Sequence, residues 1–164
     1  MPSLVLSLNL VHSLSPPYVF PNRFAVADQI RRDIPRTFPT NSIISTEEGK
    51  ERLRRVLGAY SERNPTLGYC QSMNFVAGSL LIFMEEENAF WTFAAIIEDI
   101  LPKDYYTLNL LGCRVDQQMF TQCIKWKLPR IGEHLEATDC VLEPVTCSWF
   151  MSCFSRCSTC FVPL

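Results

Sequence analysis

The chain has 164 residues, which is enough for one ordinary domain and too few for two. Hydrophobic residues make up 48% of it and charged residues 20%, a composition that excludes a chain disordered throughout. The formal net charge of −2 argues against a general nucleic-acid binder, which carries a basic surplus. Residues 23–63 nevertheless hold nine basic and six acidic groups, so positive charge gathers in the first half.

Residues 1–22 combine Ser, Pro and apolar side chains without a steady period, which predicts a poorly ordered leader. No Lys or Arg precedes this apolar run and Pro16 and Pro17 interrupt it, so the pattern is not that of a signal peptide. No uninterrupted apolar stretch reaches the length of about 18 residues that a membrane span needs. We therefore predict a cytoplasmic protein without an integral membrane segment.

The first helix is expected over 25–33. Pro35 and Pro39 follow it closely, and proline removes an amide donor and restricts the residue before it. A continuing helix is therefore not expected there, and Arg36 is predicted to lie on a stiff loop between the two prolines.

A second, amphipathic helix is expected after Ser45-Thr46-Glu47-Glu48. This tetrapeptide has the form of a capping box, in which the Ser45 hydroxyl and the Glu48 carboxylate bond each other's free backbone amides. Apolar side chains then recur at helical spacing. They are Leu53, Val56, Leu57 and Tyr60.

The rest of the chain also follows a helical period, and no segment alternates as a strand would. Apolar residues surround the axis over 71–84, which predicts a buried helix. The predicted fold class is all-α, with several helices in one domain. Further helices are expected from Glu85–Glu87 to before Pro102, over 114–126, from Pro129 and from Pro144.

Eight cysteines are many for a cytoplasmic chain. Those within helical patterns (Cys70, Cys113 and Cys123) are expected to be small buried hydrophobes. Near the end of the chain, thiols are numerous enough for a structural zinc, but only Cys157 and Cys160 have the usual Cys-x-x-Cys spacing. A secreted disulfide or zinc module therefore stays open as a third interpretation, while no metal site is predicted. The other thiols of this segment are Cys140, Cys147 and Cys153.

Conventional catalytic constellations are missing from the sequence. The six glycines form no phosphate-binding loop, and His12 and His134 have no partner Cys or Ser at a suggestive spacing. The acidic triplet Glu85–Glu87 is best explained as a helix start. We expect no cofactor, and neither a hydrolase nor a kinase interpretation finds support.

Two polar motifs remain. One is Ile30-x-x-Asp33-x-x-Arg36, and the other is Tyr69-Cys70-Gln71, preceded by Arg63-Asn64-Pro65 and Gly68. With these motifs the sequence resembles the TBC domain, the all-helical module of GTPase-activating proteins for Rab-type small GTPases. Further similarity runs through Glu87, Ala89-Phe90-Trp91, Tyr105-Tyr106, Leu111-Gly112, Val115-Asp116-Gln117, Leu128-Pro129, His134-Leu135 and Trp149-Phe150.

The resemblance implies a role in vesicle trafficking, with a GTP-bound Rab-type GTPase as partner and membrane association only through that partner. It makes Arg36 an arginine finger and Gln71 a glutamine finger, both supplied in trans. Asp33, within the same motif as Ile30, would orient Arg36, and Tyr69 would shape its loop and touch the GTPase. Taken alone, Arg36 would be a solvated surface charge and Gln71 a residue at a helix start.

The sequence also departs from the family. A complete TBC domain is longer and begins with an R-x-x-x-W motif, whereas no Trp precedes Arg36 here. The resemblance therefore implies a TBC domain incomplete at both ends, over 25–154, with a non-family leader over 1–24 and a Cys-rich tail over 155–164. An inactive fragment that binds a GTPase without activating it is the alternative function.

Overall fold

The computed structural model describes residues 22–103, 105–107 and 109–156, and helices account for most of them. No strand occurs within these ranges, so the expected all-α class is confirmed. The elements in chain order are α1 (Arg23–Asp33), the 3₁₀ turn η1 (Ile34–Arg36), α2 (Glu47–Arg63), α3 (Met73–Phe83), α4 (Glu86–Ala95), the π-helical turn η2 (Ile96–Ile100), α5 (Leu111–Lys127), α6 (Pro129–Ala137) and α7 (Glu143–Met151).

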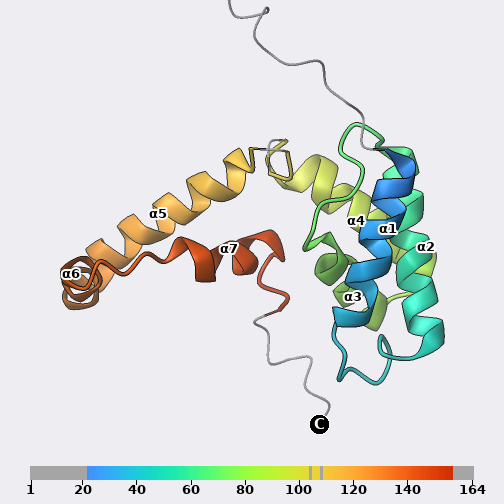
Figure 1. The fold of residues 1–164 in the computed structure, drawn as a ribbon, viewed down its shortest axis with the longest axis horizontal. Helices are drawn as coiled ribbons and strands as arrows, with labels where there is room; N and C mark the ends of the chain where they lie inside the picture. Colours follow the sequence, from blue (N-terminus) through green and yellow to red (C-terminus); the bar gives the residue numbers. More distant parts are fainter. Residues whose placement is uncertain (1–21, 104, 108, 157–164) are drawn as a thin grey trace, which may run out of the picture.

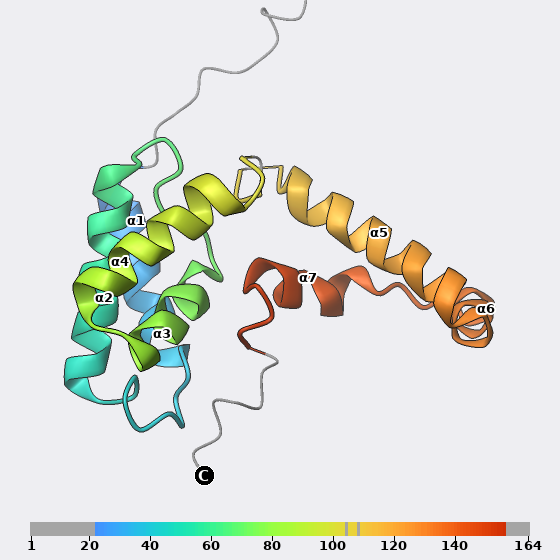
Figure 2. The ribbon, with the colours of Figure 1, turned by 180° about the vertical axis from the view of Figure 1, so that it is seen from behind.

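The helices form two parts (Figure 1). Helices α1 to α4 lie together as a bundle, and α5, α6 and α7 form an arm that leads away from it. The view from behind shows α4 crossing the bundle and continuing toward the start of α5 (Figure 2). Helix α6 lies at the far end of the arm, and α7 returns along α5 toward the bundle.

The bundle holds the main apolar core. Helix α2 contributes the expected apolar face, because Leu53, Val56, Leu57 and Tyr60 are all at most 2% exposed. The Tyr60 ring meets Phe93 of α4 edge to face, with ring centroids 4.9 Å apart. The amphipathic pattern of the sequence therefore located the buried face of α2 correctly.

Arginines on the other faces of α2 are paired with acidic side chains. Arg55 donates two hydrogen bonds to the Glu86 carboxylate, at 2.8 and 2.7 Å, and Arg63 lies 3.0 Å from Glu98. These pairs join α2 to α4 and η2, and the bond from Arg55 lowers the pKa of Glu86. Acidic residues of the second half thus balance part of the positive charge of the first half, whereas most of its basic residues pair with carboxylates in the first half itself.

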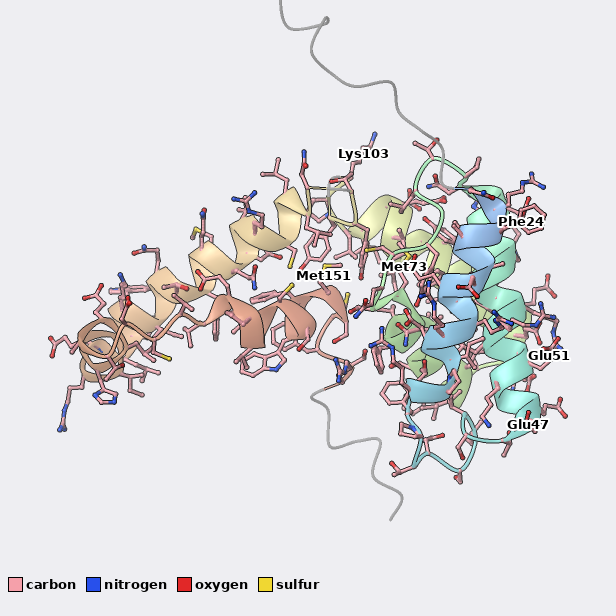
Figure 3. All side chains as sticks on the ribbon, in the orientation of Figure 1. Phe24, Glu47, Glu51, Met73, Lys103 and Met151 are labelled. Atoms are coloured by element: carbon pink, nitrogen blue, oxygen red, sulfur yellow. The ribbon has the colours of Figure 1, made fainter. Side chains whose placement is uncertain are left out.

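The arm is attached through the segment that follows η2. Tyr106 is buried, and its hydroxyl donates to the Met151 carbonyl at the end of α7, 2.8 Å away. Cys113 in the first turn of α5 is fully buried at the same junction. Met151 on the arm side and Met73 on the bundle side, both labelled in Figure 3, belong to one cluster of buried apolar side chains.

The cap of α2 is formed by Thr46 and not by the expected Ser45. The Thr46 hydroxyl accepts a hydrogen bond from the Gly49 amide at 2.9 Å. The backbone amide of Ser45 donates instead to the Asn41 carbonyl at 3.0 Å, so it is not free for the Glu48 carboxylate. The predicted capping box is therefore wrong by one residue.

Two predictions near the polar motifs are also wrong, namely the loop at Arg36 and the start of the buried helix, although α1 ends at Asp33 as predicted. The chain continues after α1 as the 3₁₀ turn η1, because Pro35 lies in the first turn of η1, where a missing amide costs no bond. The buried helix begins at Met73 and not at Gln71, because Ser72 has a left-handed backbone (φ 87°) that no right-handed helix can contain.

The helices of the arm match their predicted starts within a few residues, and Pro129 is the first residue of α6. Of the cysteines expected to be buried, Cys113 is buried and Cys70 partly so, but Cys123 is exposed on α5. No group of side chains that could hold a metal occurs in the described residues, while Cys157 and Cys160 lie outside them, as do residues 1–21.

One face of α5 is apolar and exposed. Met119 is 58% exposed and Trp126 is 74% exposed, and Leu111 and Val115 continue the same stripe toward the bundle. Such a continuous exposed stripe favours association with another apolar surface. None of the described helices combines the length and apolar character that crossing a bilayer requires.

Candidate functional site

Arg36 lies at the end of η1, one turn after the last residue of α1. Ile30 is 3% exposed and packs in the bundle core, which fixes the end of α1 that carries Asp33. The guanidinium of Arg36 donates from Nε to Asp33 Oδ1 at 2.9 Å, and its Nη2 lies 2.7 Å from the same oxygen. The Arg36 side chain remains 47% exposed, so its other N–H groups face solvent.

The Tyr69 motif lies on the connection between α2 and α3. Helix α2 ends at Arg63, and the carbonyl of the cap residue Asn64 accepts a hydrogen bond from the Gly68 amide at 2.7 Å. Gly68 has a φ of 66°, a conformation that glycine adopts without strain, and it turns the chain back toward α1. Tyr69 then enters the core and is only 6% exposed, whereas Gln71 is exposed at the tip of the next turn.

The two motifs meet at the Asp33 carboxylate. The Tyr69 hydroxyl donates to Asp33 Oδ2 at 2.6 Å, while Arg36 occupies Oδ1. Burial, followed by the bond to the Asp33 carboxylate, raises the pKa of Tyr69 far above its usual value, so Tyr69 keeps its proton and acts as a donor. One buried carboxylate therefore links segments 36 residues apart in the sequence.

The structure brings Arg36 and Tyr69 into contact with the same carboxylate, that of Asp33, and Gln71 follows Tyr69 by two residues. Within the described residues Gln71 makes no side-chain hydrogen bond, and its amide is therefore available to a partner. Ile30 is buried in the bundle core, and its supporting role stays a prediction. Contact of these residues with a GTPase stays a prediction.

Sequence reasoning missed two buried polar residues beside this cluster, Thr37 and Asn74. Asn74 is fully buried in α3, and its Nδ2 donates to the Thr37 hydroxyl at 2.7 Å. Its Oδ1 lies 3.2 Å from the Tyr69 hydroxyl. The available signal was a single amide side chain inside the otherwise apolar start of α3, since buried polar groups require partners.

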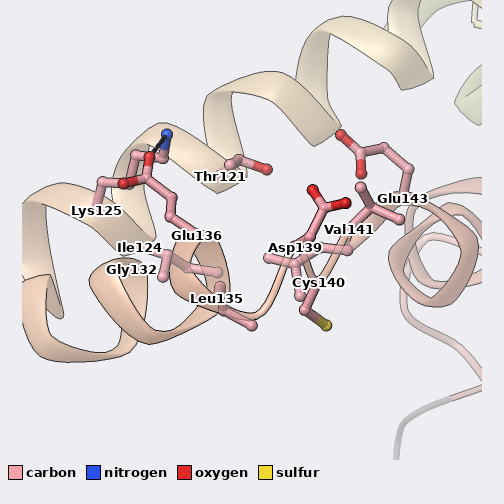
Figure 4. Close-up of a pocket in the computed structure, with 11 residues that line it drawn as sticks. Thr121, Ile124, Lys125, Gly132, Leu135, Glu136, Asp139, Cys140, Val141 and Glu143 are labelled. Carbon is pink, nitrogen blue, oxygen red and sulfur yellow. Dashed lines mark ion pairs between the residues drawn. The ribbon is translucent and has the colours of Figure 1, made fainter.

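A pocket lies apart from this cluster, between α5, α6 and the segment that follows α6 (Figure 4). Lys125 and Glu136 in its wall form an ion pair, and Asp139 and Glu143 add carboxylates on the other side. The pocket lies at the outer end of the arm, far from η1 (Figure 1). Its wall pairs no nucleophile with a base, so we do not assign the functional site to it.

Comparison with known proteins shows which protein family the chain resembles in sequence. The family model described as the Rab-GTPase-TBC domain matches residues 21–160. Human TBC1 domain family member 2B is 43% identical over 128 residues, which cover 77% of this chain and 13% of that protein. Human small G protein signaling modulator 3 is 43% identical over 131 residues, which cover 79% of this chain and 18% of that protein.

Solved structures agree with these relatives. The crystal structure of the Chlamydomonas flagellar RabGAP TBC domain superposes with a TM-score of 0.70 at 34% identity, covering 79% of this chain and 43% of that one. The Ypt/Rab-GAP domain of Gyp1p gives a TM-score of 0.70 at 20% identity, a likeness of fold, covering 90% of this chain and 53% of that one. The chain thus spans about half of these solved chains and under a fifth of the curated relatives above. It belongs to the Rab-GTPase-TBC domain family.

Proposed function

We propose that this chain is a GTPase-activating domain for Rab-type small GTPases in their GTP-bound form. It hydrolyses nothing by itself and contributes catalytic side chains in trans to the GTPase. The observation that carries the proposal is the Asp33 carboxylate, which holds Arg36 through one oxygen and the Tyr69 segment through the other. Any residence at endomembranes comes through the GTPase partner.

Arg36 supplies the arginine finger. GTP hydrolysis spreads negative charge over the γ-phosphoryl oxygens, and a permanently charged, planar guanidinium matches those oxygens. The ion pair with the 7% exposed side chain of Asp33 restricts Arg36 before it meets the nucleotide, which reduces the entropy lost on docking. The half-exposed guanidinium keeps N–H groups for phosphate while its Nε and Nη2 are occupied.

Gln71 supplies the glutamine finger. Its carboxamide can accept a hydrogen bond from the attacking water through its oxygen and donate through its NH₂ group. The exposed position at the turn before α3, without a side-chain partner among the described residues, leaves both ends of the amide free. The glutamine thereby replaces the one that a GTPase would use on its own.

The arginine is tested by Arg36→Lys in a single-turnover GTP hydrolysis assay across a panel of Rab-type GTPases. Lysine keeps the charge but loses the planar fork, so activation should fall by about 10³–10⁵, the contribution of an arginine finger. The matched control is Arg31→Lys, because Arg31 also pairs with an aspartate three residues earlier but is 80% exposed on α1. Activity of Arg36→Lys within a few-fold of the control would overturn the assignment.

The glutamine is tested with a GTPase whose own catalytic glutamine is replaced by alanine. The parent chain should still accelerate hydrolysis by this GTPase, and Gln71→Ala should not, while Gln118→Ala on the exposed face of α5 serves as control. If the parent requires the glutamine of the GTPase, Gln71 is a structural residue of the turn. Binding of the GTPase without acceleration by the parent chain would instead favour a non-catalytic interaction module.

A further inference from the structure

The buried side chains of Thr37 and Asn74 complete a ring of hydrogen bonds around the candidate site. The Thr37 hydroxyl donates to the Asp33 carbonyl at 2.9 Å and accepts from Asn74 Nδ2 at 2.7 Å. Asn74 Oδ1 in turn accepts from the Ser72 amide at 3.2 Å and, also at 3.2 Å, shares the single Tyr69 hydroxyl proton with Asp33 Oδ2 as the longer arm of a three-centre bond. The ring closes through the bond from Tyr69 to Asp33.

Every side chain of this ring is shielded from water. Asn74 is 0% exposed, Thr37 1%, Asp33 5% and Tyr69 6%. Water therefore cannot replace a bond that is lost, and an unsatisfied group in such a place is costly. The close approach that builds the ring needs Gly78 in α3, because a Cβ there would lie 2.9 Å from the Thr37 methyl group.

The ring also holds a strained turn. Ser72 has a φ of 87°, a strained conformation for an L-residue, which persists only where the surrounding structure enforces it. The bond from the Ser72 amide to Asn74 Oδ1 is one such constraint. Gln71 lies between Tyr69 and Ser72, and both of these residues are hydrogen-bonded to members of the ring. Arg36 is connected to the ring through its bond to Asp33.

We propose that Thr37 and Asn74 are positioning residues, which couple the turn that carries Arg36 to the turn that carries Gln71 so that both side chains reach the nucleotide in a fixed relation. This inference rests on the proposed function. Neither residue touches the partner, because both are buried. They act on the rate of the chemical step through the geometry of the two catalytic side chains, and not on the docking surface.

The arm contains a matched control with the same chemistry. Thr146 of α7 is 1% exposed, its hydroxyl donates to the Leu142 carbonyl at 3.0 Å, and it accepts from Gln117 Nε2 at 3.2 Å. Thr37 has the same pattern of one donated and one accepted bond. Replacing either threonine by valine keeps the shape and removes both bonds, so a general effect of lost buried bonds appears in both variants.

The test compares Thr37→Val, Thr37→Ser and Thr146→Val in single-turnover GTP hydrolysis at increasing activator concentration. Thr37→Val should lower the maximal rate by about 10- to 100-fold, the cost of a displacement near 1 Å. Its half-saturating concentration should stay close to that of the parent. Serine restores the hydroxyl, so Thr37→Ser should recover most of the rate, and Thr146→Val should keep the parent rate.

A second readout does not depend on activity. Hydrogen exchange of the Ser72 amide should accelerate in Thr37→Val and stay at the parent rate in Thr146→Val, because only the first variant removes a partner of Asn74. If Thr37→Val has the same maximal rate as the parent chain, or if its Ser72 amide exchanges at the parent rate, the proposed coupling is overturned. A parent chain that fails to accelerate hydrolysis overturns the proposed function instead, and the Ser72 exchange then still decides whether Thr37 and Asn74 hold the turn.

Discussion

The bond from Tyr69 to Asp33 can be removed almost without changing shape, by Tyr69→Phe. The phenyl ring keeps the packing of the original side chain, while the 2.6 Å hydrogen bond to Asp33 Oδ2 disappears. A hydrogen bond to a charged group contributes about 1.5–3 kcal/mol, and Asp33 at 5% exposure has little water to replace it. We therefore expect the free energy of unfolding to fall by about 2 kcal/mol.

Tyr105→Phe is the matched control for this variant. The Tyr105 hydroxyl donates to Asp116 Oδ2 at 3.0 Å, which is the same kind of pair at the start of the arm. Urea unfolding followed by far-UV circular dichroism gives the midpoint, which should drop by about 1 M for Tyr69→Phe if the slope is near 2 kcal/mol per M. Only Tyr69→Phe should also lower GTPase activation, because only Tyr69 bonds the carboxylate that holds Arg36.

The same variant has a signature at alkaline pH. Burial and the Asp33 carboxylate raise the pKa of Tyr69 in the folded protein, whereas in the unfolded chain tyrosine titrates near pH 10. Above pH 10 the unfolded state of the parent binds fewer protons than the folded state, so this contribution to stability is complete below pH 10 and decreases as pH rises, by up to about 1.4 kcal/mol per pH unit.

The stability difference between parent and Tyr69→Phe should accordingly shrink between pH 10 and pH 11.5. Tyr60, whose pKa burial raises to about 12, contributes equally to both proteins and cancels in the comparison. A difference that stays constant over this range would refute the reasoning, as would a Tyr69→Phe midpoint equal to that of the parent at pH 7.

Three further perturbations test the packing of α2 and the exposed face of α5. Gly58→Ala should raise the free energy of unfolding by about 0.5–1 kcal/mol in urea titration, because nothing lies within 4 Å of the added methyl group and alanine favours α2. Gly49→Ala should lower the free energy of unfolding, since the added Cβ would overlap the Ile43 carbonyl oxygen. Equal effects of the two substitutions would contradict the packing at the start of α2. The exposed stripe of α5 should cause concentration-dependent self-association in sedimentation velocity, and Met119→Lys with Trp126→Lys should reduce it while Arg114→Lys should not. A monomeric parent at all concentrations would show that the stripe is too small to associate.

Local chemistry explains why the helices could be predicted from the sequence. Side chains repeat every 3.6 residues on a helix, so the spacing of Leu53, Val56 and Leu57 is enough to identify the buried face of α2. Pro129 likewise marks the first residue of α6, since its missing amide is needed by no bond there. The family, and with it Arg36 and Gln71 as candidates, is recognised from motifs rather than from physical reasoning.

The errors lie where a local rule had two solutions. Either Ser45 or Thr46 could cap α2, and the choice depended on the Ser45 amide finding a partner in the preceding turn. Cys123 fits a helical apolar pattern, yet the arm leaves that face of α5 uncovered. Periodicity reports which residues share a face and not what lies against it.

Only the tertiary structure decided how the candidate site is assembled. Tyr69 and Asp33 are 36 residues apart in the sequence, and no pattern in either segment specifies that their side chains share a hydrogen bond. The buried amide of Asn74 finds its partner Thr37 only because α3 and η1 pack closely together at Gly78. The sequence by itself therefore determined the helices and named the two candidate fingers. The relative positions of the two candidate fingers depend on tertiary packing. Burial removes water, so each buried polar group needs a hydrogen-bond partner from a distant segment.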